Sequence, residues 1–248
     1  MRRNIAIIFM SFIILPSMNA QKFVIDDAFI ENYAFKVKQI SEFMSRFNLE
    51  TCLITPKQDS LWRVYNRVLL FDRETYETNQ QRADSLISMI EKDSIQLHYS
   101  DTIWTAYAKC RVSYMGKEDS IVLALKPELR GENMYRWVIV EAFGELLSLP
   151  SKTLSEHFYI SPVDNELNFI SLSQITTNNS SNIMQYAGSQ FELDGLSVFY
   201  TMVYTKQLRI LNVQEMTYHF DLSHNHSFDV CYFNRTDKNS GWLIYNFK

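Results

Sequence analysis

The strongest constraint on the fold is a change in the spacing of apolar residues near residue 104. Before this point, apolar side chains recur every three or four residues, which is the period of an amphipathic helix. Between residues 104 and 114 they alternate one by one with other side chains, which is the period of a strand with one buried face. This order predicts an α+β fold in which helices precede an antiparallel sheet.

Two segments carry the helical period. Residues 25–47 begin with Asp26 and Asp27, which suit the positive end of a helix dipole, and continue as one long amphipathic helix. Residues 78–92 predict a shorter helix, and residues 60–70 fit a helix or a strand equally. The apolar stripe of the long helix consists of Phe29, Tyr33, Val37, Ile40, Met44 and Phe47.

The predicted sheet begins with three strands. The first, at 104–114, is followed by a turn at 115–118 and by strands at 120–126 and 134–142. Residues 163–190 have no regular period and contain a polar run, which is typical of a loop or linker. We therefore expect an α+β domain at 21–162 and a polar linker or loop at 163–190.

A second, smaller unit is expected at 191–248. Residues 190–207 predict a helix, although their β-branched and aromatic content also allows a strand. Three antiparallel strands follow, and a turn ending in Gly241 joins the last two. These strands are predicted at 208–222, 227–234 and 242–247.

The first twenty residues have the pattern of a secretory signal peptide. Arg2 and Arg3 precede an apolar run of about eleven residues, shorter than the roughly twenty needed to span a bilayer. We expect cleavage after Ala20, export to the periplasm or cell surface, and no integral membrane segment in the mature chain. A retained N-terminal anchor is the alternative.

Composition narrows the function classes. Removing the signal takes two of the 24 basic residues, so 22 face 28 acidic ones and the net charge is −6. The scattered lysines and arginines form no basic stripe, which argues against nucleic acid as a partner. The six glycines are too widely spaced for a dinucleotide or phosphate-binding loop, so no cofactor is expected. Three cysteines allow at most one disulfide within the chain.

Several segments together resemble the NTF2-like superfamily. They are the helix at 25–47, the strand WTAYAKCRVSY at 104–114, the turn at Gly116 and Lys117, and YRWVIVEA at 135–142. The resemblance covers residues 22 to about 160 and implies a cone-shaped fold with a long N-terminal helix packed on a curved antiparallel sheet. The segment at 240–247, SGWLIYNF, looks like part of a further helix-plus-sheet unit. The chain also resembles exported bacterial proteins of uncharacterised function.

A cone-shaped sheet suggests a pocket for a small apolar ligand. We expect Trp104, Tyr114 and Trp137 to edge it, because small residues in the middle of the 104–114 strand leave room for a close approach. The alternative is that the long N-terminal helix packs into the same space.

A second group of polar residues lies near a predicted turn. His219 and Asp221 share a strand face, and His224 and His226 follow, which could supply ligands to a zinc-like ion. The alternative is a polar turn between two strands. The spacing matches no standard metal motif, so neither metal ligands nor catalytic residues are predicted.

The sequence favours a non-enzymatic exported protein that binds or assembles at the bacterial cell envelope. Its partner would be another envelope protein or a second copy in a homodimer. The alternative is a small-molecule-binding protein or an NTF2-like enzyme, of isomerase or dehydratase type, that uses the pocket inside the sheet.

Overall fold

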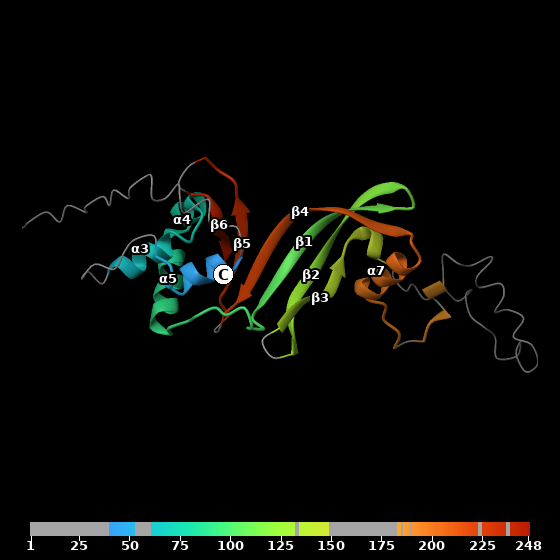
Figure 1. Cartoon of the computed structure of the whole chain (residues 1–248), viewed down its shortest axis with the longest axis horizontal. Coiled ribbons are helices and arrows are strands. Elements are labelled where there is room, and N and C mark those ends of the chain that lie inside the picture. Colours follow the sequence, from blue (N-terminus) through green and yellow to red (C-terminus); the bar gives the residue numbers. More distant parts are fainter. Residues whose placement is uncertain are drawn as a thin grey trace, which may run out of the picture.

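The computed structural model describes residues 40–52, 61–131, 134–148, 183–184, 186–188, 190–222, 225–236 and 239–248. A six-stranded antiparallel sheet runs through an elongated molecule, with helices α2 to α5 at one end and α7 at the other (Figure 1). The predicted α+β class is therefore confirmed. The predicted signal peptide, residues 25–39 of the long helix and most of the predicted linker lie outside the described residues.

The helices at one end agree with the apolar periods except in one place. α2 (Ile40–Phe47) is the last part of the predicted long helix. α3 (Leu61–Val68) shows that the segment at 60–70, which fitted a helix or a strand, is a helix. α5 (Gln80–Lys92) matches the predicted helix to within two residues. α4 (Arg73–Thr78) was not predicted; it begins where the Asp72 side chain accepts a hydrogen bond from the Thr75 backbone, 3.0 Å away.

The strands lie in the order β3-β2-β1-β4-β5-β6, so the β1–β4 pair joins the two halves of the sequence into one sheet. The β1–β2 turn lies within the predicted 115–118 but is shorter: it is a two-residue hairpin with positive φ at Met115 and Gly116, and β2 already begins at Lys117. The strands are β1 (Trp104–Tyr114), β2 (Lys117–Gly131), β3 (Met134–Phe143), β4 (Leu208–Asp221), β5 (Ser227–Phe233) and β6 (Gly241–Phe247).

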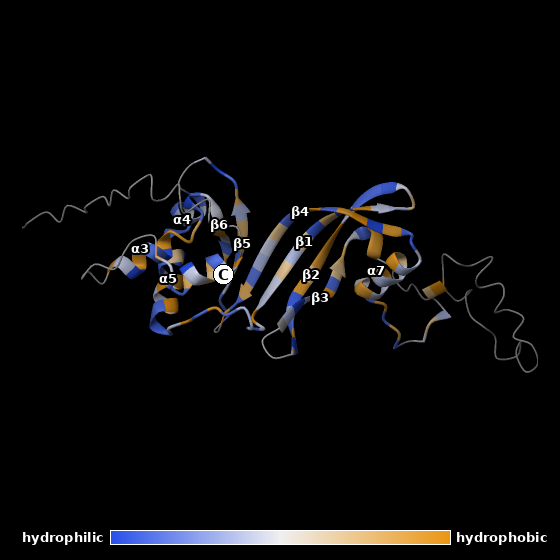
Figure 2. Ribbon diagram, in the orientation of Figure 1, coloured by the Kyte–Doolittle hydropathy of each residue, from blue (hydrophilic) through white to orange (hydrophobic). Residues whose placement is uncertain are grey.

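One face of the sheet carries the core. Every second residue of β1 from Trp104 to Val112 is buried, as the alternation predicts. Helices α2 to α5 cover this face at the Trp104 end, where Phe43 packs near Phe220 and Phe228. Helix α7 (Gly195–Tyr204) and the short 3₁₀ helix η1 (Glu145–Leu147) cover it at the Val112 end. Hydrophobic residues are concentrated along β2 and on α7 in Figure 2.

Helix α7 confirms the predicted helix at 190–207 in a shorter form. It begins at Gly195, where an added Cβ would lie 2.2 Å from the carbonyl oxygen of Ala142 on β3. The glycine therefore permits a close contact between helix and strand rather than weakening the helix. None of the described helices is long and apolar enough to span a bilayer.

Strand β2 extends beyond the predicted 120–126, and its end leaves the sheet. Pairing with β1 stops at Leu125, opposite Ala106, whereas pairing with β3 continues through Pro127. Proline has no backbone N–H, so it interrupts a ladder at this point. Residues 126–131 and 134–138 therefore form a two-stranded projection, the β2–β3 arm.

Candidate interaction surface

The structure brings together two of the three predicted pocket residues. Trp104 is 1% exposed and meets Trp137 edge to face, with ring centroids 5.4 Å apart at 87°. Tyr114 lies ten residues further along the same strand, about 33 Å away at 3.3 Å per residue. Tyr114 therefore does not line a small pocket with the two tryptophans.

The surroundings of Trp104 are filled by other aromatic rings. It stacks on Phe220 at 6.0 Å and meets Tyr99 at 5.3 Å. Among the described residues, its buried indole N–H has no hydrogen-bond acceptor. Trp104 is therefore a core residue, and Trp137 packs against it from the solvent side.

The outer residues of this cluster and Leu129, which is opposite Tyr135 in the ladder, form what we call the aromatic surface: Tyr99, Leu129, Tyr135 and Trp137. Trp137 is 42% exposed and Leu129 is 59% exposed, on opposite strands of the β2–β3 arm. Tyr99 meets Tyr135 at 5.8 Å and Trp137 at 6.0 Å, both edge to face. Burial raises the pKa of the Tyr99 hydroxyl above its ordinary value.

Sequence reasoning missed three members of this surface. Tyr135 lies two residues before Trp137 on the same strand, so strand periodicity could have found it. Leu129 pairs with Tyr135 only because β2 continues past Pro127. Tyr99 lies in a loop without a period, so its position depends on packing.

The aromatic surface adjoins an open sheet edge. Among the described residues, no backbone group of β3 forms a hydrogen bond outside its ladder with β2, and the sheet ends there. Near one end of this strand, Gly195 of α7 packs closely against the Ala142 carbonyl. Arg136 and Glu141 are the only charged residues of this strand. A long, mainly apolar edge with few charges is a template for pairing with another chain.

The opposite edge is covered. Phe71 forms a parallel bridge with Ile244 of β6, where the Asp72 N–H donates to the Ile244 carbonyl at 2.9 Å. Three further β6 carbonyls accept hydrogen bonds from helix-end side chains, so little of this edge is left for a partner. The donors are Arg46 to Trp242, Thr75 to Tyr245 and Arg82 to Phe247.

The predicted polar group is brought together only in part. The His219 Nδ1 atom lies 2.6 Å from Asp229 Oδ1, and its Nε2 lies 3.6 Å from Asp221. Asn246 donates to the other Asp229 oxygen at 2.7 Å. Sequence reasoning missed Asp229 and Asn246, because the β4–β5 and β5–β6 pairings place them.

The other predicted ligands do not join this group. His226 contacts the backbone carbonyl of Lys248 at 3.1 Å, and His224 lies outside the described residues. The described part of the chain contains no group of three metal-type ligands. The arrangement is that of a histidine held between two carboxylates on the open face of the sheet.

Cys52, Cys110 and Cys231 all lie in the described part of the chain and form no disulfide. Burial raises the pKa of Cys110, and it raises the pKa of Cys231 to about 11. Burial also raises the pKa of Cys52, against the opposing effect of Arg67 and Arg63. Because the thiolate is the reactive form, these side chains are poor nucleophiles at neutral pH.

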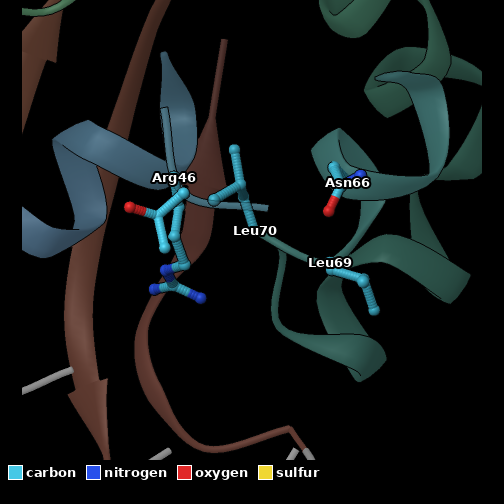
Figure 3. Close-up of a pocket in the computed structure, with 5 residues that line it drawn as sticks. Arg46, Asn66, Leu69 and Leu70 are labelled. Carbon is cyan, nitrogen blue, oxygen red and sulfur yellow. The ribbon is translucent and has the colours of Figure 1, made fainter. Parts of the chain in front are cut away.

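A shallow depression lies between α2 and α3 (Figure 3). Its cavity volume is about 0 Å³, against the roughly 300 Å³ of a typical small-molecule site. Arg46 reaches away from it to donate to the Trp242 carbonyl at 2.7 Å. The lining residues are Arg46, Thr51, Asn66, Leu69 and Leu70.

Comparison with protein-family models, curated proteins and solved structures gave no match to this chain.

Proposed function

We propose that this chain is an exported, non-enzymatic binding or assembly protein of the bacterial cell envelope, which contacts its partner through the aromatic surface and the β3 edge. The exposed tryptophan, tyrosine and leucine side chains beside the open edge of β3 carry this proposal. Aromatic residues are enriched at protein interfaces, and an open edge supplies main-chain hydrogen bonds. The surface has few charges and suits a protein partner with a matching strand.

The proposal includes an NTF2-like arrangement with a long N-terminal helix. Its support is the packing of α2, whose Phe43 and Phe47 lie against the rings of Phe220 and Phe228 on the core face. A helix continued backwards through residues 25–39 would extend the apolar stripe that the sequence shows. Export is proposed from the signal pattern of residues 1–20.

Site-specific photocrosslinking in the cell that makes the protein tests the proposed surface. A photoreactive amino acid is introduced at Leu129 or Tyr135, and in separate cells at Tyr232. Tyr232 is 43% exposed but lies on β5, away from the open edge, so it is the matched control.

The proposal expects crosslinked adducts from positions 129 and 135 and few from 232. Mass spectrometry of the adducts identifies the partner, whether another protein or a second copy. Equal adduct formation at all three positions, or none at 129 and 135, would contradict a binding role for this surface.

A further inference from the structure

We infer that strand β3 pairs antiparallel with β3 of a second copy, about a two-fold axis at Val138, so that the two sheets become continuous. The inference rests on the proposed function, since it names a second copy as the partner of the open edge. Such a symmetric contact closes on itself and yields a dimer. Because the described helices and the Phe71 bridge cover the β6 edge, that edge does not extend the dimer into a filament.

A β-bulge makes the strand self-complementary. In the β2–β3 ladder, Glu141 pairs with Ala124 and Ile139 pairs with Leu125, so Val140 is an extra residue. Side chains directly opposite in a ladder share a face. On β2, residues 124, 126 and 128 are two positions apart and therefore share a face. Their partners on β3 are Glu141, Val138 and Arg136, in that order, so these three side chains also share a face.

This placement sets the register with a second copy. A two-fold axis perpendicular to the sheet preserves faces, so residues that meet across it must share a face. With the axis at Val138, this residue lies opposite its own copy, 137 lies opposite 139, and 136 lies opposite 141. Val140 remains the extra residue in both copies. Arg136 then lies opposite Glu141 twice, and Trp137 lies beside Ile139 on the core face.

The charges and the apolar side chains act together in this register. Both charged side chains of β3 are exposed, and each gains an opposite charge. In the single chain, Arg136 pairs with Glu128 at 3.0 Å across the arm, and both groups are about half exposed. Such a pair is weak, so Arg136 can turn toward the second copy. A stable dimer buries about 800 Å² per partner, so the aromatic surface of the arm must add to the strand contact.

Charge reversal tests the register. Arg136→Glu places two carboxylates together at both ends of the pair, and Glu141→Arg places two guanidinium groups together there. Sedimentation equilibrium of the mature chain should give a dimer for the wild type. Either variant should raise the dissociation constant of the dimer by about tenfold or more. Mixing the two variants in equal amounts should restore a dimer, because the mixed pair recovers opposite charges at each end.

Arg111→Glu is the matched control. Arg111 is an exposed arginine of β1 that pairs with Glu118, so its reversal changes the net charge equally but leaves β3 intact. It should dimerise as the wild type does. A wild-type monomer at high micromolar concentration, or a mixture that stays monomeric, would overturn the inference. Adducts to another protein from positions 129 and 135 would then still support the proposed function.

Discussion

The two edges of the sheet differ in whether other parts of the chain cover them. Strand β6 has the sequence GWLIYNF without a charged residue, and its carbonyls are occupied by the Phe71 bridge and by donors from the helices. Strand β3 has one arginine, one glutamate and a bulge, and it has no backbone partner beyond β2 among the described residues. An edge covered by its own chain needs no charge, whereas an open edge is protected or used.

We therefore expect the β6 edge to contribute to the stability of the fold and the β3 edge to contribute to binding. Phe71, Asp72 and Arg46, which cover β6, are buried, so their loss should strongly destabilise the protein. The residues of β3 and its arm are half exposed, so their loss should change association more than stability. The predictions below separate these effects, from the largest to the smallest.

Phe71→Ala should give the largest loss. Phe71 is 2% exposed and meets Phe247 at 5.5 Å, so the substitution leaves a cavity beneath the β6 edge and should lower the free energy of unfolding by about 4 kcal/mol. Phe143→Ala is the matched control on β3, where the ring is 45% exposed, and should lower it by less than about 1 kcal/mol. Urea denaturation measures both. Similar losses at the two edges would contradict the comparison.

Asp72→Asn should have a smaller effect that depends on pH. Burial favours the neutral acid, but hydrogen bonds from Thr75 and Arg235 outweigh it and lower the pKa of Asp72. A lowered folded-state pKa stabilises the fold above the unfolded value, about 4, and this stability is lost as pH falls through the folded value.

The variant keeps a side-chain oxygen for the helix cap but loses the 2.6 Å ion pair with Arg235. At pH 7 it should lower the free energy of unfolding by about 2 kcal/mol. Below pH 4 the gap from the wild type should narrow, as thermal denaturation across pH 2 to 7 would measure. A constant gap would show that the carboxylate charge contributes nothing.

Trp137→Ala should separate stability from association. Its ring is 42% exposed, so the free energy of unfolding should fall by about 1 kcal/mol, while dimerisation weakens at least tenfold. Trp104→Ala, directly beneath it, should lower the free energy of unfolding by about 4 kcal/mol, because Trp104 is buried. Denaturation and sedimentation of both variants would check this. Unchanged association in the folded Trp137 variant would remove the aromatic surface from the interface.

Glu128→Gln should have the smallest effect. It removes an exposed ion pair with Arg136, so the free energy of unfolding should change by less than about 0.5 kcal/mol. Arg136 is then released toward Glu141 of the second copy, and dimerisation should tighten by about twofold. Sedimentation equilibrium would detect the change, and weaker dimerisation would mean that the Arg136–Glu128 pair supports the interface.

Local patterns predicted much of the fold. The alternation at 104–114 gave β1 with its observed bounds, since side chains on successive positions must face opposite ways. The pattern missed α4, whose sequence RETYET has no apolar period and which depends on the Asp72 cap. It also ended the second strand too early, because Pro127 is tolerated where β1 no longer pairs with β2.

The candidate surface was only partly predictable. Trp137 was predicted, but its contact with Trp104 depends on β1, β2 and β3 lying side by side. On the other side of β1, the β1–β4 pairing joins residues about a hundred positions apart. Tyr114 was misplaced for a local reason, since ten residues of strand separate it from Trp104. The open edge has no sequence signal of its own, because only the strand order decides which strand is last.

Hydrogen exchange at the two edges tests the central claim most directly. Amide exchange in the peptides covering 134–143 and 241–247 is followed by mass spectrometry at low and high protein concentration. The account predicts protection of 241–247 at every concentration, and protection of 134–143 that rises as the dimer forms. Exchange in 134–143 that is independent of concentration would contradict an open edge that pairs with a second copy.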